Sequence, residues 1–556
     1  MLPLSCDTIA LPGSFRFPVS NHLIQGDSEL QTQRIPIIRN QAVISLGLFV
    51  IALWVAWQIG GKIATNDLRT LAFSTVIFAG CIAAVIILRN WRSGFFIFLV
   101  WLLFEDLVRK YLGNNSALFF GKDILALLTY ISLFTALRQG REERFRPPFL
   151  FSLSLFIWLG ALQVFNQNSP SVLYGLLGFK LYFFYIPLMY VGYALIRNDE
   201  DLRKFLALNA VLAIVIASLG IIQAILGHSF LNPTKLAPEI RELGQLDRVT
   251  PLTNQTLSLP TAVFVSTGRF ALFLILATIL TLGAAGYLLL STRRNRNLVF
   301  IAVGLVGGAT LFSGSRGAVV YGAASTLVLA VGFLWGAPWR WRQAHRLIKA
   351  TRRSFIVAAL GLAAILLIFP VEAGSRIAFY TETLNPNSSA YELSSRSWEY
   401  PISNLIGAFT RPNWVLGNGI GMASLGTQYV AKLLGQRPPN IWVEEGYGQL
   451  IIEMGIIAPF LWFLWTGALL IYSWRVVRRL RQTRFFPIAF AIFWYAFLLL
   501  YPFTYGGLSP YQNFVSNAYF WLLIGILFRL PVILATPSIP IAIPSSKPRA
   551  RGGFQF

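Results

Sequence analysis

Long apolar runs separated by short polar links dominate the chain. A helix needs about 20 mainly apolar residues to cross about 30 Å of hydrocarbon. Fourteen segments meet this requirement, with approximate limits 42–60, 69–88, 93–111, 121–137, 148–165, 174–196, 205–226, 269–291, 297–313, 317–337, 354–370, 447–472, 486–502 and 514–530. The pattern predicts an all-α polytopic membrane protein of about 14 transmembrane helices.

Composition supports this fold class. Of 556 residues, 56% are hydrophobic and 12% are charged, with a mean hydropathy of +0.62, which excludes an ordinary soluble domain. The net charge is +24. In a membrane protein such an excess reflects basic loops that set orientation, so we expect the lipid bilayer and no nucleic acid as a partner.

Basic side chains concentrate in alternate connections, namely 89–92, 138–146, 293–296, 340–353 and 475–484. The positive-inside rule places these connections and both termini in the cytoplasm. The chain then divides into a cytoplasmic N-terminal tail (1–41), a polytopic membrane domain (42–530) and a C-terminal cytoplasmic tail (531–556). Proline and serine enrich the last segment, which predicts disorder.

Two long connections, 227–268 and 371–446, fall on the opposite side of the membrane. The second precedes the twelfth span and contains turn-rich stretches, "TETLNPNSSAYELSSRSW" and "WVLGNGIGMASLG". We expect it to form a small ordered cap with short helices. Any ligand outside the cytoplasm would meet these two connections.

Ionisable side chains inside spans cost about 2.5 to 3.5 kcal/mol or more at the bilayer centre and usually mark a polar cavity. In the predicted topology they all fall in the outer half of their helices, so the cavity opens away from the cytoplasm. They are Glu105, Asp106, Arg109, Lys110, Lys122, Asp123, Lys180, Arg269, Arg316 and Glu453.

Structural roles are an alternative for these charges. Glu105 and Arg109 are four residues apart, a spacing that suits a local ion pair on one helix face. Lys180 is interpreted equally well as having an interior partner or as serving a cavity. Glu453 can equally satisfy a neighbouring helix.

Arg316 lies in "SGSRGAVV" (313–320), at the end of a four-residue link between two spans. A guanidinium stays charged and can bind two phosphate oxygens at once, which suits a lipid-linked phosphate at the outer surface. The alternative is an interfacial anchor.

Glu444 and Glu445 lie in "NIWVEEGYGQLIIEMGIIAP" (440–459), where the large connection re-enters the membrane. Negative charge at a helix N-terminus is stabilised by the helix dipole, which gives a structural interpretation. In the functional interpretation one of them is a general base that takes a proton from a hydroxyl.

Together these stretches resemble the O-antigen ligase and polymerase superfamily of GT-C-type membrane glycosyltransferases. Residues 315–317 match its "SRG" element, and Arg396, Trp398 and "GNGIG" (417–421) are similar to its "R-x-W … G-x-G-x-G" stretch. "EEGYGQLIIEMGIIA" resembles its re-entry element. "FEDLVRKYL", "GKDILALL" and "GFKLYFFYIPL" resemble a polymerase-like branch, so the resemblance covers about Gly94 to Phe528.

One departure affects the mechanism that the resemblance implies. Aligning Tyr447 with the family aromatic residue puts Glu444 where ligases carry a histidine. The histidines of this chain, His22, His228 and His345, are far from that element in sequence. This favours a polymerase or an exopolysaccharide-type relative, with an O-antigen ligase as the alternative.

The resemblance implies transfer of a glycan from an undecaprenyl-diphosphate-linked oligosaccharide to an acceptor glycan hydroxyl. The reaction would occur at the periplasmic face of the bacterial inner membrane, without metal or other cofactor, alongside other polysaccharide-assembly proteins.

Site residues follow from the same resemblance. Arg316, then Arg269 and Arg396, would stabilise the departing diphosphate, and Glu444 would receive the acceptor proton. Further substrate contacts are assigned to Glu445, Lys180, Tyr447 and Trp398. The two aromatic side chains would stack on sugars or, alternatively, pack in an aromatic core.

Two other classes remain as alternatives. A transporter or flippase of lipid-linked glycans should show inverted repeats, broken helices near the midplane and charges in both halves of the bilayer. A non-catalytic scaffold of an assembly complex would tolerate loss of Arg316.

Overall fold

The structure is a computed structural model that describes residues 68–112, 116–233, 247–291, 296–338, 368–389, 391–439 and 446–535. The predicted spans 42–60 and, for the most part, 354–370 lie outside the described residues, as do the N-terminal tail, Glu444 and Glu445. Within the described part, nine helices are long and apolar enough to cross a membrane. This confirms an all-α polytopic membrane protein.

The described helices follow the predicted apolar segments closely, usually within a few residues at each end. In chain order the membrane-domain helices are α2 (Leu68–Arg89), α3 (Trp91–Leu112), α4 (Ser116–Arg138), α5 (Leu150–Val164), α6 (Val172–Phe183), α7 (Leu188–Leu195), α8 (Asp199–Leu226), α10 (Thr267–Ser291), α11 (Arg296–Phe312), α12 (Arg316–Gly336), α17 (Tyr447–Met454), α18 (Ile457–Arg479), α19 (Phe486–Leu498), α20 (Thr504–Gly506), α21 (Ser509–Gln512) and α22 (Phe514–Ala535).

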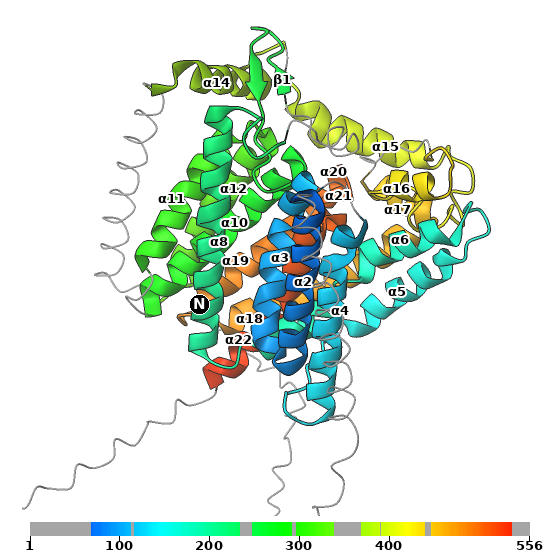
Figure 1. The fold of residues 1–556 in the computed structure, drawn as a ribbon, viewed down its shortest axis with the longest axis vertical. Helices are drawn as coiled ribbons and strands as arrows, with labels where there is room; N and C mark the ends of the chain where they lie inside the picture. The colour runs from blue at the N-terminus through cyan, green and yellow to red at the C-terminus, as the bar shows by residue number, and fades with distance from the viewer. Residues whose placement is uncertain are drawn as a thin grey trace, which may run out of the picture.

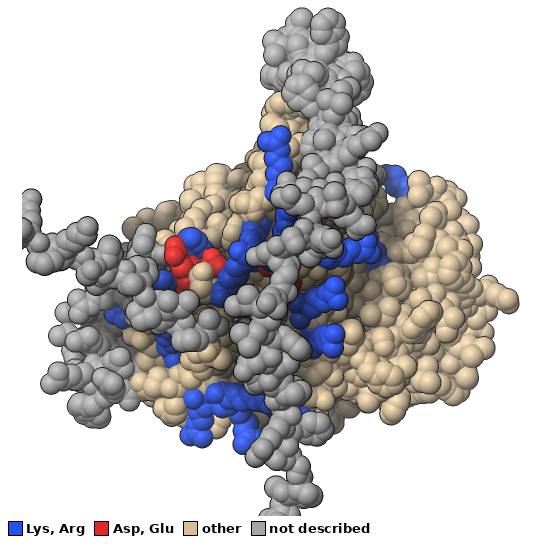
Figure 2. Space-filling view, turned by 90° about the horizontal axis from the view of Figure 1, so that it is seen from below, with Lys and Arg blue, Asp and Glu red and all other residues tan. Residues whose placement is uncertain are grey.

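Both long connections lie at one end of the helix bundle, the upper end in Figure 1, which we call the cap end. The first contributes an antiparallel hairpin of β1 (Asp247–Val249) and β2 (Thr256–Ser258). The second contributes α14 (Pro370–Leu384), a π-helical turn (Ser395–Glu399), α15 (Tyr400–Ala408) and α16 (Thr427–Leu433). Figure 2 shows the opposite end, where Lys and Arg side chains gather.

Two segments predicted as continuous spans are broken helices. Segment 174–196 is α6 followed by α7, with Pro187 at the start of α7, because proline lacks the N–H that a continuous helix needs. Segment 447–472 is α17 followed by α18. Gly455 separates them with a φ of +82°, in the left-handed region that favours glycine.

The C-terminal boundary of the membrane domain also differs from the prediction. Helix α22 continues to Ala535, past the expected end at 530. Residues 531–535 are mainly apolar, and Ile533 is buried against the bundle, so burial extends the helix into the segment expected to be disordered.

Polar side chains satisfy the backbone groups that the break between α6 and α7 leaves without helical partners. The Tyr511 hydroxyl donates to the Tyr182 carbonyl (3.2 Å), and the Asn517 amide donates to the Leu181 carbonyl (3.1 Å). Hydrocarbon offers no water for this purpose, so such partners allow a helix to end inside the bundle.

Arg376 of α14 fastens the cap to the bundle. Its buried guanidinium donates to the carbonyls of Phe312 (3.1 Å), Ala224 (3.0 Å) and Ser258 (3.0 Å). Two of these carbonyls lie at the C-terminal ends of α11 and α8, where unsatisfied carbonyls and the helix dipole favour a cation. Arg376 was not singled out from the sequence.

Glu453 of α17 has the structural role that the sequence left open. The carboxylate is fully buried and accepts hydrogen bonds from the Tyr182 hydroxyl (2.9 Å), the Ala423 N–H (2.9 Å) and the Ser424 hydroxyl (2.8 Å). It therefore joins α17, α6 and the loop that contains "GNGIG" and continues through Ala423 and Ser424. Charged acceptors of this kind make stronger hydrogen bonds than neutral ones.

The glycines of that loop are required by its conformation and its close packing. Gly421 has a φ of +93°, and a Cβ there would lie 2.0 Å from the Tyr174 carbonyl oxygen. Gly421→Ala should therefore lower the free energy of unfolding by about 2 kcal/mol or more. Thermal unfolding of the purified protein in detergent would measure this loss. Gly407→Ala is the control, because a Cβ at Gly407 meets open space.

Candidate functional site

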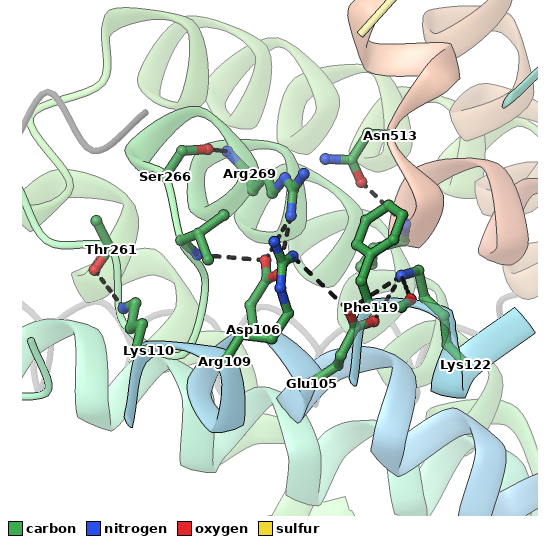
Figure 3. A network of polar contacts seen from close by, with 12 residues as sticks. Glu105, Asp106, Arg109, Lys110, Phe119, Lys122, Thr261, Ser266, Arg269 and Asn513 are labelled. Carbon is green, nitrogen blue, oxygen red and sulfur yellow. Dashed lines mark hydrogen bonds and ion pairs between the residues drawn. The ribbon is translucent and has the colours of Figure 1, made fainter. Parts of the chain in front are cut away.

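Eight ionisable side chains from four helices meet near the cap end of α3. We call them the charge cluster: Glu105, Asp106, Arg109, Lys110, Lys122, Asp123, Lys180 and Arg269. Figure 3 labels all of these residues except Asp123 and Lys180. The sequence singled out each of these residues, and the structure brings them together.

Asp106 is the centre of the cluster. Its buried carboxylate contacts the guanidinium groups of Arg269 (2.7 Å) and Arg109 (3.0 Å) and accepts the Val265 N–H (3.3 Å). Arg269 is at the start of α10, so this carboxylate holds α3, α10 and the segment before α10 together. Removing such a carboxylate would leave the buried Arg109 and the partly buried Arg269 without this counter-charge.

Glu105 lies one residue earlier and pairs chiefly with a different helix. Its carboxylate is 2.9 Å from the Lys122 ammonium of α4 and 3.8 Å from the Arg109 guanidinium. The predicted local pair with Arg109 is therefore present, but Arg109 is closer to Asp106, three residues before it. Both spacings put side chains on one helix face.

Lys180 has the interior partner that the sequence allowed. Its ammonium is 2.5 Å from the Asp123 carboxylate, which also accepts the Tyr185 hydroxyl (3.1 Å). The pair bridges α6 and α4. The Lys180 side chain keeps 18% of its surface exposed, but its ammonium nitrogen is buried, so the exposed part is the aliphatic stem.

Lys110 holds the segment between β2 and α10. Its ammonium donates to the Thr261 hydroxyl (2.8 Å) and the Ala262 carbonyl (2.9 Å). Gln223 of α8 accepts the N–H groups of the same two residues, at 2.8 and 2.6 Å. Ala262 has a φ of +49°, a conformation that side chains other than glycine rarely adopt, so these contacts fix a strained backbone.

An aromatic ring lies among the cations. The Phe119 ring centroid is 5.0 Å from the Arg109 guanidinium, 3.9 Å from the Lys122 ammonium and 4.6 Å from the Lys180 ammonium. Ring faces attract cations. Tyr429 of α16 stacks on Phe119 with centroids 6.3 Å apart, so the cap reaches the cluster. Neither aromatic residue was predicted, because aromatic residues make up 15% of the chain and give no local signal.

A second group of charges contains two arginines, Arg316 and Arg396, with the Glu392 carboxylate between them. We call this group the arginine pair. Glu392 of the cap is 2.8 Å from the Arg316 guanidinium and 3.1 Å from that of Arg396. The structure thus brings together two of the predicted site residues. Glu392 was missed, although it precedes Arg396 by four residues, a spacing typical of helical ion pairs.

Local structure fixes the position of Arg316. It is the first residue of α12, and the Ser315 hydroxyl accepts the Ala318 N–H as an N-terminal cap (3.3 Å). The side chain is 14% exposed, and its Nη2 contacts Glu392. Among the described residues, its buried Nη1 has no hydrogen-bond partner. The guanidinium therefore retains donor capacity for an anionic group.

The Glu392 carboxylate stays ionised at neutral pH. Burial alone would raise its pKa, but hydrogen bonds from Arg316 and Arg396 outweigh burial and hold the pKa below its ordinary value of 4.5. One negative charge is thus shared by two positive charges.

The remaining predicted site residues are not brought to either group in the described part. Glu444 and Glu445 lie outside the described residues. Tyr447 packs edge-on against Phe463 with ring centroids 4.9 Å apart, as the alternative of aromatic packing predicts. Trp398 is 67% exposed on the π-helical turn, and its proposed contact with sugar stays a prediction.

No family model, curated protein or solved structure matches the chain. Among the described residues, no group of three or more His, Cys, Asp or Glu side chains could hold a metal ion. The class defined by fold and site is an all-α polytopic membrane protein with two cation-rich groups.

Asp106→Asn should destabilise the protein by about 3 to 5 kcal/mol, because the neutral amide leaves the buried Arg109 and the partly buried Arg269 without this carboxylate. Denaturant or thermal unfolding in detergent measures the change. Glu200→Gln is the matched control, since it removes a carboxylate from an exposed ion pair with Lys204. Equal stability of Asp106→Asn and wild type would exclude this structural role.

Proposed function

We propose that this protein is an O-antigen or exopolysaccharide polymerase-like glycosyltransferase that uses a polyprenyl-diphosphate-linked donor, undecaprenyl diphosphate in bacteria. The observation that carries the proposal is the fixed guanidinium of Arg316, with a buried donor not used by the described residues. Its position at the cap end of the bundle suits the head group of a membrane lipid. The sequence resemblance supplies the reaction class.

The reaction requires what these residues offer. The acceptor hydroxyl oxygen attacks the anomeric carbon, the bond from that carbon to the diphosphate oxygen breaks, and the acceptor proton passes to a base. Negative charge grows on the departing diphosphate. Arg316, with Arg396 beside it, would meet that charge, and Glu444 would take the proton directly or through water.

The same proposal sets the orientation. The cap end would face the periplasm, and the basic opposite end would face the cytoplasm with both termini, in the bacterial inner membrane. An acceptor glycan and other polysaccharide-assembly proteins would then approach from the cap side. In this scheme Arg269 mainly holds Asp106 in position. It contributes less to binding the diphosphate, because the Asp106 carboxylate already neutralises much of the Arg269 charge.

Arg316→Ala should reduce glycan transfer at least about 100-fold, because it removes a charged donor from the departing diphosphate. The assay is turnover by the purified full-length protein with a defined polyprenyl-diphosphate-linked oligosaccharide, with product length resolved. Arg316→Lys should recover part of the activity, since an ammonium keeps the positive charge but cannot make the bidentate hydrogen bonds of a guanidinium.

Arg197→Ala is the matched control for Arg316→Ala, because Arg197 is half exposed and pairs with Glu142 away from both groups. It should leave turnover unchanged. Normal polymer formation by Arg316→Ala would reject the proposed role and favour a non-catalytic scaffold. In the wild-type assay, a ladder of products indicates a polymerase, whereas a single transfer indicates a ligase.

Glu444→Gln should lower turnover by about 100- to 10,000-fold, because the amide cannot accept the acceptor proton. Glu445→Gln, with the same change one residue later, is the comparison. If both variants keep wild-type turnover, the two carboxylates have the helix-capping role instead.

A transporter of lipid-linked glycans is the second candidate, and the broken segments α6–α7 and α17–α18 favour it. The eight side chains of the charge cluster gather at one end, which does not suit alternating access. Labelled lipid-linked sugar that moves between leaflets of proteoliposomes, with no new glycosidic bond, would support this candidate.

A further inference from the structure

We infer that Glu392 is an internal competitor of the substrate: its carboxylate occupies the guanidinium groups of Arg316 and Arg396 until a phosphate group displaces it. Glu392 would thereby decide which anions reach Arg316. The identity of the natural ligand, a polyprenyl diphosphate, rests on the proposed function. The role of Glu392 rests on the geometry of its contacts with the two arginines.

The closest contacts of Glu392 with both arginines are made by the same oxygen. Its Oε2 is 2.8 Å from Nη2 of Arg316 and 3.1 Å from Nε of Arg396. A carboxylate that pairs with arginine frequently uses both oxygens and contacts two parallel N–H groups. Here Nη1 of Arg316 is buried and has no partner among the described residues. Glu392 therefore satisfies the Arg316 guanidinium only in part.

A phosphate group would replace this carboxylate with better geometry. It carries three acceptor oxygens, so different oxygens can contact Arg316 and Arg396. Two of them can also contact the paired N–H groups of one guanidinium. An uncharged sugar lacks the negative charge that Glu392 supplies. The two arginines therefore favour a phosphate over the carboxylate that contacts them now.

Exposure indicates that Glu392 can leave the two arginines, whereas Arg316 stays in place. The side chain of Arg316 is 14% exposed, while those of Glu392 and Arg396 are 43% and 52% exposed. Because Glu392 already contacts water, separating it from its partners costs little. Arg316 lies against the cap, with its guanidinium 5.5 Å from the ring centroid of Phe379, which is buried.

Short-range contacts hold the backbone that carries Glu392, in the stretch between α14 and the π-helical turn. The Ser388 N–H donates to the Asn385 carbonyl (3.0 Å), and the Tyr391 N–H donates to the Ser388 carbonyl (3.1 Å). The Glu392 N–H donates to the Thr383 carbonyl of α14 at 3.5 Å, which is long for a hydrogen bond. We therefore expect this stretch to move when the carboxylate is displaced, without unfolding of α14.

The tether between Glu392 and the site makes this carboxylate hard to displace for a weakly binding anion. A group held near its partner by a short connection acts as if present at a concentration on the order of millimolar. A free carboxylate at lower concentration would lose that competition. A diphosphate has more charge and more oxygens, so it can win. Glu392 would thus determine specificity for highly charged phosphates.

Binding of inorganic pyrophosphate to the full-length protein in nanodiscs of neutral phosphatidylcholine tests the inference. Glu392→Gln keeps the size of the side chain but removes the competing charge. It should bind pyrophosphate at least about tenfold more tightly than wild type, which corresponds to about 1.4 kcal/mol. Isothermal titration calorimetry measures both Kd values. An equal or weaker affinity of Glu392→Gln, or no binding by either protein, would overturn the inference.

Glu399→Gln is the matched control. Glu399 is exposed, lies three residues after Arg396, and makes no ion pair among the described residues. Its loss removes the same charge from the same part of the cap, and screening by salt should keep the change in affinity below about twofold. A gain equal to that of Glu392→Gln would mean that net charge alone matters and would contradict the inference. Adding Arg316→Met to Glu392→Gln should abolish the gain, which locates the effect at Arg316.

A readout on the wild-type protein detects the movement itself. When pyrophosphate binds, amide hydrogen exchange should become faster in the stretch between α14 and the π-helical turn, because this stretch loses its contact with Arg316. Exchange in α14 around Phe379 should stay unchanged. Slower or unchanged exchange in the stretch with pyrophosphate bound would mean that the anion binds without displacing Glu392, and the inference would be wrong.

Failure of this inference and failure of the proposed function give different results. If the protein is not a transferase, no glycosidic bond forms in any variant, while pyrophosphate still binds more tightly to Glu392→Gln. If Glu392 instead holds the arginines in place for the substrate, Glu392→Gln binds pyrophosphate more weakly and has a higher KM for the lipid-linked donor, while turnover still depends on Arg316. If both proposals hold, Glu392→Gln lowers this KM without raising kcat.

Discussion

The contact of Asp106 with Arg109 and Arg269 is the constraint on which the cap end depends. It joins α3 to the start of α10 in a place where water cannot stabilise separate charges. The loop before α10 is held by the same carboxylate and by Lys110. Because these ties are electrostatic and buried, the segment has a fixed position although its backbone is irregular.

The cap is held by a different kind of contact at each side. Arg376 satisfies the carbonyl ends of α8 and α11, and Glu453 gathers hydroxyl and N–H donors from α6 and the "GNGIG" loop. One is a cation among acceptors and the other an anion among donors. Arg376 thereby fixes the end of α11, from which the short link to Arg316 begins.

Much of the fold follows from the sequence, because hydropathy over about 20 residues is a strong signal for spans such as 269–291, observed as Thr267–Ser291. The breaks at Pro187 and Gly455 were missed, because both residues lie within apolar runs that hydropathy alone treats as continuous. The charged members of the site were found because charge is rare in spans. Their partners, such as Glu392 for Arg316 and Asp123 for Lys180, depend on tertiary contacts that no local pattern encodes.

The Asp106–Arg269 contact joins residues 163 positions apart, which has a consequence for synthesis. At about 5 to 20 residues per second, the ribosome adds Arg269 about 8 to 30 seconds after Asp106. Helix α3 must therefore enter the bilayer before Arg269, the counter-ion of its Asp106 carboxylate, has been synthesised. Arg109, one turn along the same helix and 3.0 Å from the same carboxylate, can shield that charge during the interval.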